Sequence, residues 1–377
     1  MERMPALDAL RGVAILLVML FHFNLGPATG NPIGRALFLG FRVGGSGVDL
    51  FFVLSGFLIT RILVRTKGSR GYFVNFYARR TLRIFPLYYG VLVIVLVVLP
   101  GVGTHLSREA EAHQAWLWLY GTNLYQTLRG FYAFGELDHL WSLAVEEQFY
   151  LVWPLVIVAC GRRTAMGVCV GCMVAAPLVR AWLASGGNMV GAYVFTLGRV
   201  DALAAGALAA LVGGMPGRGF SRAGVLMSGL AFGGLLAWKR ENATMDLTTM
   251  TARFSLSAIF FGFVVRLALG ASSNEVGWVF WNSRVLRFFG KYSYGLYVYH
   301  HLLVTTFRRT LPVETLAEWF GSAMAGRIAA MVVYGAVSVA VAFASWHVFE
   351  KPFLTFKRFF EREAGAGGSR GAGRALD

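Results

Sequence analysis

The feature that most constrains this chain is a series of long apolar runs that occupies nearly its whole length. A bilayer-spanning helix needs about 20 mainly apolar residues, and ten runs meet that length, at approximately residues 8–26, 43–64, 82–100, 138–160, 164–184, 193–213, 222–239, 252–270, 287–307 and 326–349. Only 14% of the residues are charged, whereas roughly a quarter are charged in a soluble domain. The sequence therefore predicts an all-α, polytopic bundle of about ten transmembrane helices and excludes a water-soluble globular protein.

The apolar runs leave no segment long enough to form a separate soluble core, so residues 1–355 are expected to form one membrane-embedded domain. We expect the first run to be a retained span rather than a removed signal peptide, because it lacks a small-residue cleavage site. Residues 356–377 are expected to form a C-terminal tail. From about residue 363 this tail is glycine-rich, has no packable face and is predicted to be disordered.

The chain carries a net charge of +16, which fits nucleic acid, anionic lipid or phosphate-bearing ligands. With the N-terminus inside, the connections on that side hold 17 Lys and Arg residues and the opposite connections hold eight. Because basic residues favour cytoplasmic connections, both termini are predicted to be cytoplasmic. This asymmetry explains much of the basic excess, so membrane lipid is an expected partner and nucleic acid is not.

The three cysteines, Cys160, Cys169 and Cys172, lie within or next to apolar runs. Their odd number argues against a disulfide framework. Cys169 and Cys172 have the spacing of some zinc sites, but no second ligand pair lies nearby in the sequence. We interpret all three as helix-packing residues and predict no metal site.

Ionisable residues inside apolar runs are costly and usually face a protein interior, so they mark candidate functional positions. In the first run Arg11 precedes His22 by eleven residues. On a helix this spacing points both side chains the same way within about 20°, roughly 16 Å apart. Asp8 is three residues before Arg11 and can pair with it. A snorkelling arginine and a histidine satisfied within the bundle are the structural alternative.

The second run carries Asp49 near its outer end and Ser55 before Gly56. A pair of small residues also permits close helix packing, which is the alternative explanation for Ser55 and Gly56. Asp49 has no such simple explanation and remains a candidate for a cavity.

Three arginines, Arg79, Arg80 and Arg83, occupy one helical turn in the connection that leads into the third run. A guanidinium presents a fork of donors that suits phosphate oxygens. The cluster therefore fits a phosphorylated ligand that arrives from the cytoplasm, although the preference for basic residues on that side is an equal explanation.

Later runs contain further polar residues. In the fourth run they recur every three or four residues and form one stripe on a helix: His139, Ser142, Glu146, Tyr150 and Trp153. Glu147 points about 100° away from Glu146, so we expect only one of the two acids to face the same cavity. Arg199 and Asp201 are too close in sequence to pair on a helix, so each is expected to have a partner elsewhere. The ninth run adds Tyr297, His300 and His301.

Seven blocks of this sequence resemble motifs of the acyltransferase-3 family of integral membrane acyltransferases, which modify bacterial surface glycans and some secondary metabolites. In order they are LDALRGVAILLVMLFHF, GVDLFFVLSGFLIT, YARRTLRIFPLYY, HLWSLAVEEQFYLVWP, GRVDALAAGALAA, GKYSYGLYVYHH and VFEKPF, which together extend from residue 7 to about 355. The resemblance implies a ten-span helical domain in a bacterial inner membrane. It also implies an acyl-CoA donor, commonly acetyl-CoA, with no tightly bound cofactor.

The resemblance implies catalytic roles for Arg11, His22 and Glu146, and donor binding in the region of Arg80 and Arg83, to which we add Arg79. Acyl transfer to a hydroxyl needs a general base and donors for the developing oxyanion. His22 is the expected base, and Glu146 is expected to orient it or to bind the acceptor. The remaining candidates for the acceptor site or cavity are Asp8, Asp49, Ser55, His139, Ser142, Glu147, Arg199, Asp201, Tyr297 and His301.

The expected activity is O-acylation of a carbohydrate hydroxyl, such as that of a cell-surface polysaccharide or lipid-linked glycan. O-acylation of a small molecule such as a macrolide antibiotic and non-catalytic transport are the alternatives. A covalent acyl-histidine or acyl-Ser55 intermediate is left open. Some family members carry a C-terminal esterase-like domain, and here a glycine-rich tail follows the last run. The chain is thus expected to pass the acyl group on by itself or through a separate acyl-transfer partner protein.

Overall fold

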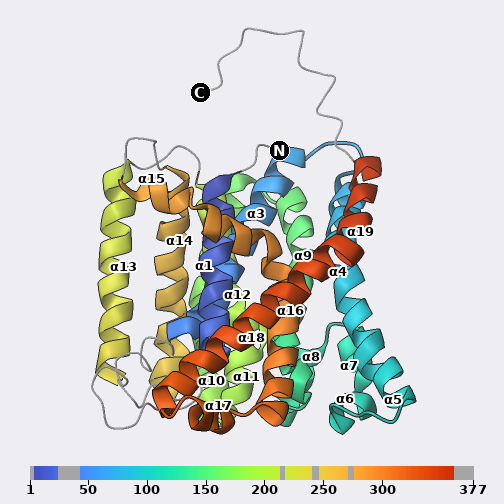
Figure 1. The fold of residues 1–377 in the computed structure, drawn as a ribbon. Coiled ribbons are helices and arrows are strands. Elements are labelled where there is room, and N and C mark those ends of the chain that lie inside the picture. The colour runs from blue at the N-terminus through green and yellow to red at the C-terminus, as the bar shows by residue number, and fades with distance from the viewer. Residues whose placement is uncertain (1–3, 24–42, 213–216, 240–245, 271–275, 361–377) are drawn as a thin grey trace, which may run out of the picture.

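A computed structural model describes residues 4–23, 43–212, 217–239, 246–270 and 276–360. Within these residues the regular structure is helical and contains no strand, which confirms the predicted all-α fold. Nine helical segments among them are long and apolar enough to cross a membrane. A further long helix, α16 (Arg284–Thr310), carries several basic residues and runs through the bundle beside the others (Figure 1). It corresponds to the predicted span at 287–307.

The other long helices match the predicted runs in number and order. They are α1 (Pro5–His22), α3 (Gly47–Thr66), α4 (Tyr72–Val93), α9 (Trp141–Ala159), α10 (Arg162–Ser185), α12 (Thr196–Leu211), α13 (Arg218–Lys239), α14 (Phe254–Leu269) and α18 (Ala323–Ser345). Short helices join or extend them: α5 (Leu99–Gly101), α6 (Arg108–Ala112), α7 (Gln114–Trp118), α8 (Thr122–Arg129), α11 (Met189–Val194), α15 (Val276–Trp281), α17 (Val313–Trp319) and α19 (Lys351–Thr355).

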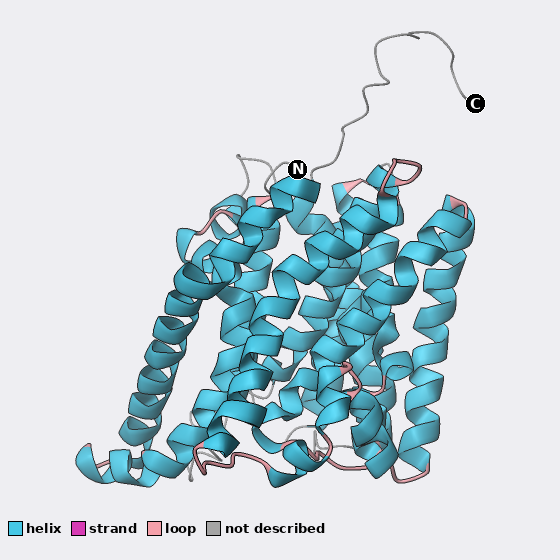
Figure 2. Ribbon diagram, turned by 90° about the vertical axis from the view of Figure 1, so that its right-hand side faces the viewer, coloured by secondary structure: helices cyan, strands magenta, loops and turns pink. Residues whose placement is uncertain are grey.

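The long helices run between two faces of the bundle (Figure 2). The start of α1 and the end of the described chain, after α19, lie at one face, here named the terminal face (Figure 1). The short helices α6 and α17 lie at the opposite, distal face (Figure 1). A side chain near the start of α1 or α4 is thus close to the terminal face, whereas the ends of α1 and α16 are distal.

Two predicted spans differ from the helices in the structure. Helix α4 begins at Tyr72 rather than at residue 82, after Gly71 in the left-handed conformation (φ 77°), so the three arginines lie inside the helix. Because the three arginines are charged, the first turns of α4 have a low mean hydropathy, and the predicted span therefore began too late. The sixth span is broken at Phe195, which is extended and separates α11 from α12. A 3-10 helix, Phe356–Phe360, lies within the predicted tail 356–377, and the part predicted to be disordered, from about residue 363, lies outside the described residues.

Two pairs of helices approach so closely that only glycine fits between them. A Cβ atom at Gly290 of α16 would collide with the carbonyl oxygen of Asp8 in α1. One at Gly56 of α3 would collide with the carbonyl oxygen of Leu203 in α12. The small residue at position 56 therefore serves helix packing, as the structural alternative proposed.

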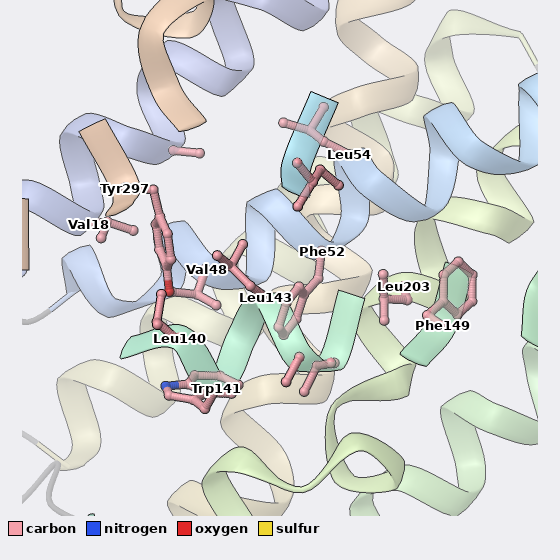
Figure 3. Packing of buried hydrophobic residues seen from close by; sticks show 14 of the residues in the cluster. Val18, Val48, Phe52, Leu54, Leu140, Trp141, Leu143, Phe149, Leu203 and Tyr297 are labelled. Atoms are coloured by element: carbon pink, nitrogen blue, oxygen red, sulfur yellow. The ribbon is translucent and has the colours of Figure 1, made fainter. Parts of the chain in front are cut away.

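Apolar side chains fill most of the space between the helices. Phe52 of α3, Trp141 of α9 and Leu203 of α12 are all less than 5% exposed (Figure 3). Tyr297 of α16 enters the same packed region, with its hydroxyl turned toward the backbone that precedes α9 (Figure 3). Buried polar groups also occur between the helices, and the clusters that contain the candidate residues are described below.

Candidate functional site

A partly open cavity lies between α1, α3, α4, α9 and α16 and has an empty volume of about 780 Å³, including its mouth. Its apolar lining comes mainly from α3. Its polar lining consists of Arg11, Ser55, Arg80, Arg83, Glu146, Tyr150, Ser293, Tyr294 and Tyr297. All nine residues belong to the sequence blocks quoted above, and all but Ser293 and Tyr294 were singled out there as polar residues of interest. The structure thus brings together residues from the first and ninth predicted spans.

The cavity is elongated along the bundle. Its lining on α3 extends from Ile59 to Val48, a separation that corresponds to about 16 Å along a helix. This is about half of the roughly 30 Å hydrocarbon thickness of a bilayer. Arg80 and Arg83 lie toward the terminal face, whereas Val48 and Tyr297 lie toward the distal face.

The terminal end of the cavity carries an excess of positive charge. Arg11 pairs with Asp8 at 3.1 Å, as predicted. The guanidinium of Arg80 lies 5.5 Å from the ring centroid of Tyr150. Within the described part of the chain, neither Arg80 nor Arg83 has a carboxylate at ion-pair distance. Such an arrangement favours binding of an anion.

Arg79 is separated from its two neighbours. Its Nη1 donates to the carbonyl oxygen of Phe360 at 3.2 Å, at the end of the described chain. It does not line the cavity. Helix periodicity does not separate the three arginines, since Arg83 points about 40° from Arg79 and about 60° from Arg80. The hydrogen bond to Phe360 is what distinguishes Arg79.

A chain of hydroxyl and carboxyl groups crosses the middle of the cavity. The Ser55 hydroxyl bonds to the Tyr150 hydroxyl, which donates to Oε2 of Glu146 at 3.2 Å. Glu147 does not line the cavity, and its buried Oε1 has no hydrogen-bond partner in the described structure. Only one of the two adjacent acids therefore faces the cavity, as their 100° offset predicts.

Tyr297 closes the distal end of the cavity. Its hydroxyl donates to the carbonyl oxygen of His139 at 2.9 Å and lies 2.5 Å from Oγ of Ser142. Its ring centroid lies 5.6 Å from that of His139 and 5.7 Å from that of His300. Behind Tyr297 lies a group of four imidazoles, here named the histidine cluster: His22, His139, His300 and His301. None of the four lines the cavity itself, and Tyr297 separates them from it.

The histidine cluster joins the distal end of α1 to α16 and to the turn before α9. Nδ1 of His22 lies 3.1 Å from Nε2 of His300. The rings of His22 and His301 meet edge to face at 5.0 Å, and those of His139 and His301 stack at 4.7 Å. Within the described residues, no group of His, Cys, Asp and Glu side chains has the arrangement of a metal site.

Glu146 does not contact His22 in the described structure; its hydrogen bond is to Tyr150. The expectation that Glu146 orients the imidazole of His22 is therefore not met. The side chain at hydrogen-bond distance from the His22 ring is instead that of His300, whose Nε2 lies 3.1 Å from Nδ1 of His22. His301, not His300, was the predicted cavity residue. Residue 300 is three positions from Tyr297 and thus lies on the same helix face, which was the signal for it.

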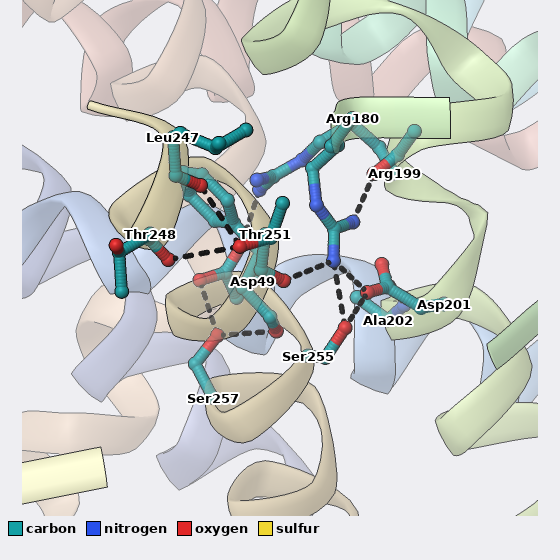
Figure 4. A network of polar contacts seen from close by, with 12 residues as sticks. Asp49, Arg180, Arg199, Asp201, Ala202, Leu247, Thr248, Thr251, Ser255 and Ser257 are labelled. Carbon is teal, nitrogen blue, oxygen red and sulfur yellow. Dashed lines mark hydrogen bonds and ion pairs between the residues drawn. The ribbon is translucent and has the colours of Figure 1, made fainter. Parts of the chain in front are cut away.

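Three of the expected cavity residues belong instead to a buried network between α3, α10, α12 and α14 (Figure 4). Asp49 pairs with Arg199, and Asp201 pairs with Arg180 at 2.9 Å. Ser257 donates to Asp49 at 2.6 Å. Asp49, Arg199 and Asp201 do not line the cavity.

This network confirms that Arg199 and Asp201 have partners on other helices. All four charged side chains are at most 2% exposed, and each charge faces an opposite charge, as a buried ion requires. Arg180 is the member that sequence analysis missed. Its presence inside an apolar run was the signal that would have found it.

Comparison with known proteins identifies the family. A family model described as an acyltransferase domain matches residues 4–347. The putative peptidoglycan O-acetyltransferase YrhL of Bacillus subtilis (strain 168) is 27% identical over 384 aligned residues, which cover 95% of this chain and 56% of that protein. The peptidoglycan O-acetyltransferase OatA of Listeria monocytogenes is 34% identical over 158 residues, 40% of this chain and 23% of that protein.

A putative O-acetyltransferase of Staphylococcus aureus (strain MSSA476), SAS0844, is 33% identical over 174 residues, which cover 42% of this chain and 25% of that protein. The chain thus spans about half the length of the Bacillus relative. No solved structure matches it significantly. The match of the family model over nearly all of the described bundle, together with the membrane-spanning helices, shows that the chain is an integral membrane protein of the acyltransferase-3 family.

Proposed function

We propose that this protein transfers an acetyl group from acetyl-CoA to a hydroxyl of a cell-envelope carbohydrate. The observation that carries the proposal is the elongated cavity. One end holds Arg80 and Arg83, which have no carboxylate at ion-pair distance among the described residues, and the other end holds Tyr297 with the histidine cluster behind it. The names of the Bacillus and Listeria relatives, which refer to peptidoglycan O-acetylation, support a glycan acceptor.

The donor is proposed to enter from the terminal face. Arg80 and Arg83 are half-buried and offer guanidinium forks to the phosphates of coenzyme A. Arg11 lies at the same end of the cavity, so we group it with these two arginines rather than with the reacting atoms. Arg79 faces Phe360 and is left out of the donor site. The pantetheine arm would extend along the cavity toward Tyr297.

Transfer is proposed to occur at the distal end, where His22 acts as general base. The acceptor hydroxyl oxygen attacks the thioester carbonyl while Nε2 of His22 takes the hydroxyl proton. The carbon–sulfur bond then breaks, and the proton passes from the imidazolium to the coenzyme A thiolate. Glu146, which lines the middle of the cavity beside Tyr150, would hold the donor arm in place.

The terminal face is proposed to be cytoplasmic, in the inner membrane of a bacterium. This orientation follows the basic excess of 17 to eight residues and gives acetyl-CoA direct access to Arg80 and Arg83. We expect a cytoplasmic reporter fused after Asp377 and a periplasmic reporter inserted near residue 120 both to be active. Activity of a periplasmic reporter after Asp377 would contradict this orientation and the entry route of the donor.

The decisive experiment is incubation of the purified protein in lipid with labelled acetyl-CoA and peptidoglycan fragments, followed by mass spectrometry of the fragments. The proposal predicts acetylated fragments and free coenzyme A in equal amounts. A parallel reaction with a macrolide tests the small-molecule alternative. Transfer to the macrolide alone would replace the glycan acceptor, and an intact thioester in both reactions would favour a non-catalytic protein.

A further inference from the structure

The pair formed by His22 and His300 is organised by backbone carbonyl oxygens. Nδ1 of His300 lies 2.8 Å from the carbonyl oxygen of Leu296. Since a carbonyl oxygen only accepts hydrogen bonds, Nδ1 of His300 carries the hydrogen. In the neutral ring its Nε2 therefore holds a lone pair and can only accept.

The tautomer of His22 follows from its own hydrogen-bond partners. Nδ1 of His22 lies 3.0 Å from the carbonyl oxygen of Val18 and 3.1 Å from Nε2 of His300. Both of these atoms are acceptors, so Nδ1 of His22 carries a hydrogen and Nε2 keeps its lone pair. In the opposite tautomer, the lone pair on Nδ1 of His22 would face the lone pairs of the Val18 carbonyl oxygen and of Nε2 of His300.

Among the neighbouring histidines, His300 is the one that accepts a hydrogen bond from Nδ1 of His22. It is fully buried, whereas His301 directs its Nδ1 to the carbonyl oxygen of Glu136 at 3.0 Å and makes only a ring contact with His22. On the other side, Nη2 of Arg308 donates to the carbonyl oxygen of His22 at 2.8 Å and ties down the end of α1. Of the described side chains, only that of His300 hydrogen-bonds to the imidazole of His22.

We propose that His300 is a positioning residue that holds His22 in the Nδ1-protonated form and keeps its Nε2 available as the base. This inference rests on the proposed acyl transfer. During transfer, Nε2 of His22 gains the proton of the acceptor hydroxyl, and the hydroxyl oxygen bonds to the acyl carbon as the carbon–sulfur bond breaks. The Nδ1 hydrogen stays in its bond to His300, which stabilises the positive ring until Nε2 returns the proton to the departing thiolate.

Two substitutions separate this role from simple packing. His300→Phe keeps an aromatic ring but removes the acceptor, whereas His300→Gln can place a side-chain oxygen near the original position of Nε2. Tyr299→Phe is the matched control on the same helix, because the Tyr299 hydroxyl bonds to Ser345 rather than to the histidine cluster. Loss of one hydrogen bond to a charged group predicts a kcat roughly 10- to 100-fold lower in His300→Phe. We expect unchanged acetyl-CoA affinity, recovery of most of kcat in His300→Gln, and normal turnover in Tyr299→Phe.

Nitrogen-15 NMR of histidine-labelled protein in lipid supplies a readout that does not depend on activity. The chain has seven histidines, and the His22 signals are assigned from their loss in His22→Ala. We expect wild-type His22 to be protonated at Nδ1, His300→Phe to shift this tautomer population, and His300→Gln to restore it. An unchanged His22 spectrum together with unchanged kcat in His300→Phe would overturn the proposal. A tautomer shift in a protein that transfers no acetyl group would support the positioning role and refute the proposed function.

Discussion

Two groups of arginines lie inside this bundle, and they differ in what surrounds them. Arg180 and Arg199 are fully buried, and each faces an aspartate on a neighbouring helix. Arg80 and Arg83 are half-buried along an open cavity and have no carboxylate at ion-pair distance within the described chain. The charges of Arg180 and Arg199 are thus neutralised by aspartates of the protein. The positive charges of Arg80 and Arg83 are available to an anionic ligand in the cavity.

The difference follows from the cost of burying charge. An ion removed from water without a partner costs several kcal/mol, so the inner arginines require Asp201 and Asp49. Arg80 and Arg83 remain accessible to water through the mouth of the cavity, so each can stay charged without a carboxylate partner and can bind an anionic ligand. A charged residue in a span is therefore a weak guide to function by itself. Whether its partner belongs to the protein separates a structural site from a binding site.

The largest expected effect lies at the distal end of the cavity, where we predict that His22→Ala loses rate and not stability. Removal of a positioned base typically lowers turnover about 100- to 10,000-fold. Turnover per folded molecule is measured with labelled acetyl-CoA, after gel filtration to count folded protein. If His22 serves only packing, the variant will instead be destabilised, and its folded fraction will turn over at the wild-type rate.

In the ion-pair network of Asp49, Arg180, Arg199 and Asp201, we predict that a substitution lowers stability and leaves turnover unchanged. Asp201→Ala leaves Arg180 buried without its carboxylate, which is expected to cost about 3–5 kcal/mol of unfolding free energy. Turnover per folded molecule should be unchanged, because Asp201 does not line the cavity. The double variant Arg180→Met, Asp201→Leu removes both charges and should recover most of the stability in a thermal unfolding assay. Equal instability of the single and double variants would mean that the charges themselves do not matter.

A smaller effect is expected from Glu146→Gln in the middle of the cavity. The amide can still accept the hydrogen bond from Tyr150, so the unfolding temperature should stay near that of the wild type. Because Glu146 is proposed to hold the donor arm, loss of its charge should misplace the thioester and lower turnover on the order of 10- to 100-fold. Glu147→Gln is the matched variant, because Glu147 does not line the cavity, and it should transfer acetyl normally. A similar loss in both variants would remove the distinction between the two acids.

The sequence predicted the helical class and the order of the spans, because bilayer thickness sets a length that apolar runs reveal directly. It misplaced the start of α4, since arginines that line a cavity lower the hydropathy of the helix that carries them. It also could not separate Arg80 from Arg199 by function. Both are arginines in or beside apolar runs, and only the three-dimensional contacts show that one faces a cavity and the other an aspartate.

The pairing of His22 with His300 was equally hidden, because these residues are 278 positions apart. Periodicity predicts which residues of one helix share a face, and Glu146 and Tyr150 of the α9 stripe do line the same cavity and hydrogen-bond to each other. It contains no information on which helices become neighbours. The resemblance to a family supplied candidate residues without their partners.

The central claim is that the cavity arginines bind the donor, and equilibrium binding of labelled acetyl-CoA tests it most directly. We predict that Arg80→Ala, Arg83→Ala weakens binding roughly 10- to 100-fold, since charge-assisted hydrogen bonds to phosphate are lost. Arg79→Ala removes a neighbouring arginine of the same helix that faces Phe360, and its affinity should match that of the wild type. Wild-type affinity in the correctly folded double variant, or an equal loss in Arg79→Ala, would contradict the account.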